Sequence, residues 1–389
     1  MHEQLTSIDG LLEQMVALGA SDLHVTVGSA PAFRVRGHIV RADGFDVFTA
    51  DDTRALLYRI LSSEQQKHFE LNRQLDFAYS MPGLARFRVN VYYQREAVGA
   101  AFRLIPQEIK SLEELSLPHI LHQLSEYPRG LVLVTGPTGS GKSTTLAAII
   151  DEINRNRAEH ILTVEDPIEF VHRHKRCIVN QREIGPDATS FGQALKAALR
   201  QDPDVILVGE MRDLETISTA LTAAETGHLV FGTLHTQSAP STIDRIIDVF
   251  PPEQQEQVRI MLAGSLQAVV TQSLLPTADG NGRVAALEIL FPDDAVRNLI
   301  RQAKIEQVYS VMQTNTARGM QTMEQALADL AVRRVVDLED ALSRSSRPDQ
   351  LIGILERSGF DVKSALAQNG ANAAHAAQPP TPALRMAGG

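Results

Sequence analysis

The first hundred residues combine two kinds of hydrophobic spacing. Apolar residues between positions 8 and 18 recur at helical intervals, and Leu23, Val25 and Val27 then alternate with polar residues as in a strand. A second strand around Phe33 to Val35 would complete a hairpin. A helix is predicted over 53–61, and strand-like runs follow over 75–79, 86–93 and 98–105. Helices beside antiparallel strands predict a small α+β domain over residues 1–110.

The pattern changes after residue 129. Short, continuously apolar runs occupy 131–134, 161–164, 205–208 and 229–232, with helical stretches between them. Such runs are typical of a parallel sheet covered on both faces, so an α/β domain is expected over 129–290. The remaining segments are predicted as a linker with a helix over 111–128, a helical region over 291–362 and a disordered tail over 363–389.

A glycine-rich loop stands between the first apolar run of this domain and the next predicted helix. It reads Gly136, Pro137, Thr138, Gly139, Ser140, Gly141, Lys142 and Ser143, which fits the phosphate-loop pattern at every fixed position. Glycines allow backbone N–H groups to converge on phosphate oxygens, and the following helix start favours negative charge. We therefore predict that the loop binds ATP and Mg²⁺. Lys142 is expected on the β and γ phosphates, the Ser143 hydroxyl on Mg²⁺ and Thr144 near the α phosphate.

Carboxylates at neighbouring strand ends would complete such a site, since hydrolysis needs groups that hold Mg²⁺ and orient water. Glu210 follows the run 205–208, with Gly209 in the place where many ATPases carry an aspartate. Glu210 is expected to act on Mg²⁺ through water, on the attacking water, or on both. Glu165 and Asp166 follow the run 161–164 and form a second acidic pair.

Two histidines bracket the run 229–232. His228 precedes it and His235 follows it, within the segments TGH and TLHT. Near a γ phosphate, either side chain would sense the nucleotide or reach a neighbouring subunit. Structural histidines are common, so this prediction rests on the phosphate loop nearby.

Composition limits the classes of function. The 389 residues carry a net charge of −10, which opposes a protein whose affinity comes from neutralising nucleic-acid phosphates. A single cysteine, Cys177, excludes an intrachain disulfide and favours a reducing, cytosolic compartment. Neither a signal peptide nor a run of about 18 apolar residues is visible, so no membrane insertion is expected.

The motifs together resemble one superfamily. The phosphate loop, TVEDPIEF (163–170), DVILVGEMRD (204–213) and TGHLVFGTLHT (226–236) are similar to the Walker A, Asp box, Walker B and His box of the secretion and type IV pilus ATPases. AVRNLIRQ (295–302) and GMQTMEQAL (319–327) are similar to motifs of the twitching-motility retraction branch, the PilT family. Gln302 departs from that branch's final glutamate, and Val296 replaces an isoleucine.

The resemblance implies a PAS-like N-terminal domain, a RecA-like ATPase domain and a homohexameric ring. In such rings, arginines of the N-terminal domain reach the nucleotide phosphates, and Arg103 and Arg88 are favoured over Arg95 for this role. Catalysis would use Lys142, Glu210 and Glu165, with the two histidines nearby. The implied partners are an inner-membrane pilus platform protein and a retraction paralogue. The location would be cytoplasmic, at the periphery of the inner membrane.

Three alternatives remain at this point. The first is a retraction paralogue, or a pilus-assembly or type II secretion ATPase of the same superfamily. The second is a RecA-like nucleic-acid translocase, which the acidic balance and the lack of basic-aromatic runs oppose. The third is a scaffold that binds nucleotide without hydrolysing it.

Overall fold

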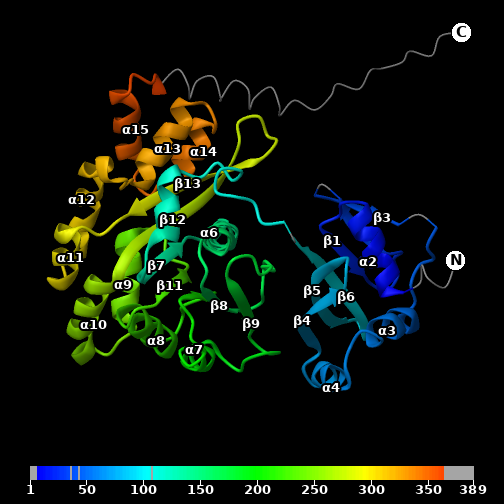
Figure 1. Cartoon of the computed structure of the whole chain (residues 1–389). Helices are drawn as coiled ribbons and strands as arrows, with labels where there is room; N and C mark the ends of the chain where they lie inside the picture. The colour runs from blue at the N-terminus through cyan, green and yellow to red at the C-terminus, as the bar shows by residue number, and fades with distance from the viewer. Residues whose placement is uncertain (1–6, 36, 43, 107, 363–389) are drawn as a thin grey trace, which may run out of the picture. The chain divides into compact units, whose positions relative to one another are not determined.

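The computed structural model of the chain describes residues 7–35, 37–42, 44–106 and 108–362 (Figure 1). The predicted disordered tail lies outside these residues. The described chain forms two compact units, and each is described by itself. The first holds the residues up to 109 together with 165–173 and 181–188, two segments that sequence analysis assigned to the ATPase domain. The second holds the rest.

The first unit is built on a six-stranded sheet in the order β3-β2-β1-β6-β5-β4, and its paired strands are antiparallel. The strands are β1 (Asp22–Val25), β2 (Ala32–Val35), β3 (His38–Arg41), β4 (Gln74–Met81), β5 (Ala85–Gln94) and β6 (Ala97–Ile105). The helices are α2 (Ile8–Ala17), α3 (Ala50–Tyr58) and α4 (Ser63–Asn72). The predicted α+β arrangement is confirmed, while β3 and α4 were not predicted.

Strand alternation explains how this unit forms its core. Phe87, Val89 and Val91 on β5 are fully buried, and the residues between them are partly or fully exposed. With a period of two, a strand sends alternate side chains to one face, so this pattern buries one face of the sheet. Phe33 and Phe102 join the same core.

Most of a seven-stranded sheet, in the order β13-β12-β7-β11-β10-β8-β9, belongs to the second unit. The last residue of β8 and the second half of β9 are counted with the first unit. Its strands are β7 (Gly130–Thr135), β8 (His160–Glu165), β9 (Ile178–Glu183), β10 (Val205–Val208), β11 (Leu229–Leu234), β12 (Leu266–Pro276) and β13 (Arg283–Leu290). The central strands β12, β7, β11, β10 and β8 are parallel, and β13 returns antiparallel to β12. The four predicted runs are β7, β8, β10 and β11, which are four of these five parallel strands, and this confirms the parallel α/β core.

Helices connect the strands of this sheet. They are α6 (Lys142–Asn156), α7 (Phe191–Ala198), α8 (Leu214–Glu225), α9 (Ala239–Asp248) and α10 (Pro252–Ser265). The segment that precedes β7 holds the short helices η1 (His119–His122) and α5 (Gln123–Glu126).

The region after residue 291 is helical, as predicted. It comprises α11 (Asp294–Arg301), η2 (Ile305–Gln307), α12 (Val308–Thr314), η3 (Thr316–Arg318), α13 (Met323–Val332), α14 (Leu338–Arg344) and α15 (Pro348–Arg357). Figure 1 shows α13, α14 and α15, in orange to red, beside the hairpin of β12 and β13. Their apolar faces form one core with Leu275 and Ala286 of that hairpin.

The helix of the AVRNLIRQ motif, α11, contacts α10 through one arginine. The Arg297 guanidinium donates hydrogen bonds to the carbonyls of Ala263 and Gly264 near the end of α10. Burial lowers the pKa of Arg297. Arg297 therefore ties α11 to α10, because a cation satisfies the open carbonyls of a helix end, whereas Arg301 remains exposed.

Candidate active site

The loop after β7 has a backbone that requires glycine. Gly136, Gly139 and Gly141 have φ angles of +131°, +79° and +90°, a region that disfavours other residues. A Cβ atom on Gly136 would also lie 2.2 Å from the carbonyl oxygen of Gln272, and one on Gly141 would lie 2.7 Å from its Nε2. The glycines therefore allow the backbone of the loop to turn and allow β12 to approach the loop closely.

The helix that follows this loop begins without a side-chain cap. The N-cap residue of α6 is Gly141, whereas α7, α8 and α9 have Ser190, Asp213 and Ser238 as hydrogen-bonding caps. The first backbone N–H groups of α6 thus lack the cap that neighbouring helices have. An uncapped helix start with its positive dipole end is suited to a phosphate group.

Lys142 and Ser140 provide a test of whether this loop fits a phosphate chain. The residue Lys142 is 9% exposed, and its Nζ donates to the carbonyl oxygens of Gly136 at 2.9 Å and Pro137 at 3.1 Å. Ser140 is 3% exposed, and its Oγ has no hydrogen-bond partner among the described residues. A buried ammonium and an unsatisfied hydroxyl beside open N–H groups fit an anionic ligand with several oxygens. The Ser143 and Thr144 side chains are half-buried at the same helix start.

Gln272 holds the loop in place and was not predicted. This β12 side chain is 3% exposed; its Nε2 donates to the Ser140 carbonyl at 2.7 Å, and its Oε1 accepts from the Thr145 hydroxyl at 2.8 Å. It therefore links the loop to the first turn of α6. The only sequence signal was a group of three polar residues, Thr271, Gln272 and Ser273, inside an apolar run.

The acidic residue after β10 is joined to the end of β11. The Glu210 carboxylate oxygen Oε1 lies 2.7 Å from Nε2 of His235, and the same oxygen accepts a hydrogen bond from Nε of Arg212. These three side chains and Arg245 of α9 line a cavity of about 460 Å³. Glu210 and His235 were each expected near the nucleotide, and the structure brings their side chains into contact. Arg212 and Arg245 were not predicted.

Strand register places the predicted residues at one edge of the sheet or the other. Thr135 is paired with Leu234, and Val208 with Gly232 and Val164. The phosphate loop, Glu210, His235 and Glu165 therefore follow or end parallel strands at the carboxyl edge, where ligands of α/β sheets bind.

His228 lies at the other edge of the sheet. It precedes β11, its ring nitrogen Nδ1 is 3.0 Å from the carbonyl oxygen of Ala223, and its own carbonyl accepts from the N–H of Gly130. The six residues of β11 separate it from His235, roughly 20 Å along the strand. The expectation that His228 lies near the γ phosphate of its own chain is therefore wrong, because the strand carries it to the amino edge.

Arg88 and Arg103 lie side by side in the first unit. They are directly paired on β5 and β6, and Arg103 is also paired with Asp22 on β1. Nε of Arg103 donates to Asp22 at 2.8 Å. Burial acts to raise the pKa of Asp22, but hydrogen bonds from Arg103 and Ser21 hold it below its usual value. Both arginine side chains remain exposed. Arg88 and Arg103 together carry more positive charge than the single carboxylate of Asp22 balances.

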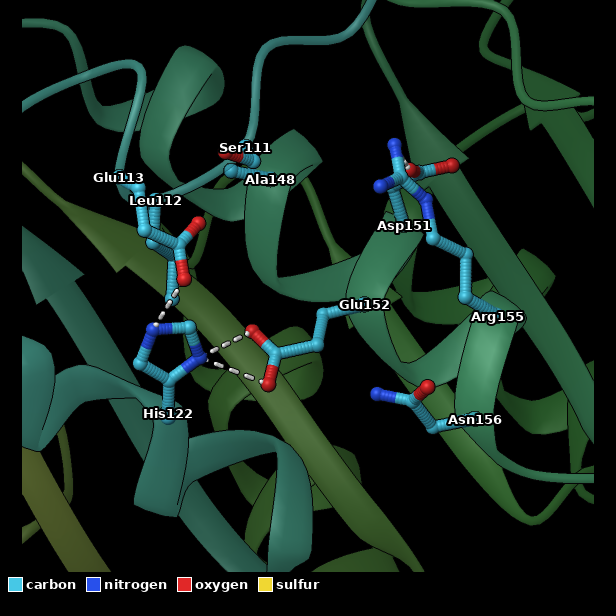
Figure 2. Close-up of a pocket in the computed structure, with 9 residues that line it drawn as sticks. All are labelled: Ser111, Leu112, Glu113, His122, Ala148, Asp151, Glu152, Arg155 and Asn156. Carbon is cyan, nitrogen blue, oxygen red and sulfur yellow. Dashed lines mark hydrogen bonds and ion pairs between the residues drawn. The ribbon is translucent and has the colours of Figure 1, made fainter.

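A separate cavity of about 240 Å³ lies between the segment before β7 and α6 (Figure 2). Figure 2 shows His122 between two carboxylates: its Nε2 lies 2.9 Å from Glu113, and its Nδ1 lies 2.9 Å from both oxygens of Glu152. The hydrogen bond to Glu152 raises the pKa of His122 against the opposing effect of burial. His122 thus connects residues 113–122 to α6.

P-loop ATPases carry a loop of this kind at the carboxyl edge of a RecA-like sheet. This protein is a P-loop ATPase. Among the described residues, none of the helices has both the length and the apolar character needed to span a bilayer.

Comparison with known proteins narrows the class. Residues 100–343 match the family model described as type II/IV secretion system protein. The chain is 51% identical to the type IV pilus retraction ATPase PilT of Pseudomonas aeruginosa, over 88% of this chain and 99% of the relative. It is 52% identical to a twitching motility protein of Neisseria gonorrhoeae, over 82% and 86% of the two chains. The crystal structure of the pilus retraction motor PilT with bound ADP superposes with a TM-score of 0.84 at 52% identity, covering 88% of this chain and 98% of that chain.

The chain therefore belongs to the type II/IV secretion ATPase family, in the branch of the pilus retraction ATPases. This confirms the resemblance drawn from the sequence motifs. A type II secretion protein E of Aeromonas hydrophila is 46% identical over only 44% of this chain and 32% of the relative, so the secretion alternative is weaker.

Proposed function

We propose that the chain is a motor that hydrolyses ATP in the presence of Mg²⁺ to drive retraction of a type IV pilus. The observation that carries this proposal is a match at 51% identity, over nearly the full length of the relative, to a pilus retraction ATPase. The phosphate loop with an uncapped helix start supports nucleotide binding independently of that match.

Binding of the nucleotide is assigned to the start of α6. Lys142 exchanges its two carbonyl acceptors for phosphate oxygens, and the open N–H groups of the loop bind the remaining oxygens. Thr144 would contact the α phosphate. The Ser143 hydroxyl would hold Mg²⁺, and Glu210 would act on the Mg²⁺ through a water molecule. Mg²⁺-ATP supplies the phosphoanhydride bond whose cleavage releases the energy for work.

Orientation of the attacking water is assigned to Glu210. His235 and Arg212 both contact its Oε1, and the described residues provide no hydrogen-bond partner for its Oε2. One oxygen is thus fixed while the other is available to accept a hydrogen bond from water. Glu165, at the end of β8, is a second carboxylate for the same role.

Charge that develops on the γ phosphate requires cations, and Arg103 and Arg88 are our candidates. The pair carries more positive charge than Asp22 balances, which suits an anionic ligand. We propose that these guanidiniums stabilise the charge on the γ phosphate during hydrolysis.

The assembly we propose is a homohexamer on the cytoplasmic side of the inner membrane. The ring would act on an inner-membrane platform protein of the pilus machine, with a retraction paralogue as a further partner. The type IV pilus ATPase PilU of Pseudomonas aeruginosa is 42% identical to this chain, over 92% of this chain and 94% of the relative. A retraction paralogue of this kind would therefore be similar to this chain along most of its length.

The test is a strain that carries Lys142→Ala. We expect loss of ATP turnover by the purified chain, loss of twitching and retention of surface pili. Lys196→Ala is a matched control, because Lys196 is an exposed lysine of α7 paired with Glu215. Absence of surface pili would indicate an assembly ATPase instead, and unchanged turnover would refute the assignment of the phosphate loop.

A further inference from the structure

Glu288 on β13 lies between the first turns of two helices. The residue is 2% exposed, its Oε1 accepts a hydrogen bond from the N–H of Ala239 at 2.6 Å, and its Oε2 accepts from the N–H of Met323 at 3.4 Å. Ala239 and Met323 are the first residues of α9 and α13. Since helix starts carry partial positive charge, one carboxylate holds two of them together.

Local capping does not explain this carboxylate. Both helices already have capping boxes, formed by Ser238 with Ser241 in α9 and by Thr322 with Gln325 in α13. Burial of a carboxyl group costs free energy that an apolar residue on β13 would avoid. The feature specific to Glu288 is that it contacts both helices at once.

The first of these helices is attached to the candidate active site. Three residues separate His235 from the start of α9, and the hydroxyls of Thr236 and Thr242 lie 2.7 Å apart, which fixes this segment to the helix. Arg245 of α9 lines the same cavity as Glu210 and His235. A change at His235 is therefore expected to move α9.

The second helix belongs to the C-terminal region. Glu324 of α13 is 1% exposed and accepts hydrogen bonds from the hydroxyls of Tyr309 at 2.7 Å and Ser345 at 3.1 Å. The Arg347 guanidinium lies over the Tyr309 ring. These contacts join α13 to α12 and to the segment between α14 and α15, so movement of α13 would reach those helices.

We propose that Glu288 is a positioning residue that couples the His235 end of the active site to the C-terminal helices, by holding the starts of α9 and α13 on one carboxylate. The inference rests on the proposed ATPase function and adds a route by which nucleotide state reaches the C-terminal region. Glu288 lies outside the nucleotide site and acts through α9.

The charge on Glu288 should matter for this coupling. Burial raises its pKa to about 7; the N–H groups of Ala239 and Met323 act in the opposite direction, as does Arg347, while Glu324 adds to the increase. Glu324 and Arg347 are thus the charged side chains that act on Glu288. Protonation would weaken its attraction to both helix starts, so coupling should decline as the pH falls through about 7.

Two measurements on the full-length chain test the proposal. The first is ATP turnover from pH 6 to 8.5, to give kcat and KM for native chain, Glu288→Gln and Glu288→Asp. The second is hydrogen exchange of peptides covering 236–248 and 320–332, with and without Mg-ADP. Glu324→Gln is the matched control, because it neutralises a neighbouring buried carboxylate that has no hydrogen bond to α9.

In the native chain, Mg-ADP should slow exchange in both peptides. In Glu288→Gln, Mg-ADP should slow exchange in the peptide 236–248 alone. The kcat of this variant should be roughly tenfold lower than that of the native chain, and its KM should stay within about twofold. Its kcat should also depend less on pH. Glu288→Asp, which keeps the charge, should recover part of the coupling and serves as the test if the glutamine variant does not fold. Unchanged coupling in Glu288→Gln, or equal loss in Glu324→Gln, would overturn the proposal. A native chain without ATP turnover would refute the proposed function, and the exchange measurement with Mg-ADP would then show separately whether Glu288 couples the two helices.

Discussion

Oε1 of Glu210 lies 2.7 Å from Nε2 of His235, so the ends of β10 and β11 are joined by their side chains at the carboxyl edge of the sheet. Because Arg212 contacts the same oxygen, two protein side chains hold the carboxylate in place. Pre-organised groups of this kind lower the barrier to reaction, since they need no rearrangement as charge develops.

Substitution of Glu210 should therefore separate binding from hydrolysis. Glu210→Gln keeps the shape of the side chain but removes the negative charge that orients water, so hydrolysis should fall about 10²- to 10⁴-fold. The affinity for ATP should stay within about threefold, because the phosphate loop carries most of the phosphate contacts. Phosphate release and titration with a fluorescent ATP analogue measure the two effects. Equal loss in Glu165→Gln, with Glu210→Gln still active, would transfer the role to Glu165.

The two histidines that bracket β11 provide an internal comparison. His235→Ala removes a contact to Glu210 and should lower kcat about 10-fold or more, with a smaller effect on KM. His228→Ala lies at the opposite edge, so its kcat should remain within about twofold of the native value, as for other changes remote from the chemistry. Steady-state turnover of both purified variants checks this. A larger loss for His228→Ala would indicate a role across a subunit boundary.

Gln272 should control affinity rather than chemistry. Gln272→Ala leaves the Ser140 carbonyl and the Thr145 hydroxyl without their buried partner. The ordered conformation of the loop should become less stable by about 1–3 kcal/mol. The dissociation constant for ATP should rise roughly 5- to 150-fold. Gln267→Ala is the control, because Gln267 lies on the same strand but contacts the carbonyl of Arg129 at the other edge. Isothermal titration of both variants is decisive, and equal affinities would show that Gln272 does not order the loop.

Residues close in sequence were predicted well because their chemistry is local. The phosphate loop, four of the five parallel strands of the ATPase sheet and the α+β character of the first unit follow from spacing alone. Glu210 and His235 were expected at one site because each adjoins a buried strand at the position the motif requires. These features depend on neighbours within about ten residues.

Features that depend on strand partners were missed. Gln272 and Glu288 act on loops and helices far away in sequence, and no local pattern shows which backbone groups they meet. β12 follows α10 without a turn residue, so its apolar run reads equally well as helix. His228 was wrongly expected at the nucleotide although it is next to β11 in sequence. The direction of β11 decides the edge of the sheet at which a flanking residue lies, and His228 precedes the strand.

His122 yields a prediction about pH. Its pKa is raised above 6.5, chiefly by the hydrogen bond to Glu152 and further by the charges of Glu152 and Glu113, against the effect of burial. A group with a raised folded-state pKa stabilises the protein fully below its unfolded value, and this contribution is lost as the pH rises through the folded value. The attachment of residues 113–122 to α6 should thus be complete below about pH 6.5 and weaken above it.

The variant His122→Gln should remove this dependence. At pH 6 it should lower the free energy of unfolding by about 1–2 kcal/mol, and near pH 9 the difference should largely disappear. Denaturant unfolding at both pH values measures the change. His119→Gln serves as control, because the His119 ring lies 4.7 Å from the His122 ring, tilted by 51°, and contacts neither carboxylate among the described residues. A difference between native chain and His122→Gln that stays constant with pH would mean that packing, rather than the charge on the imidazole, holds this segment to α6.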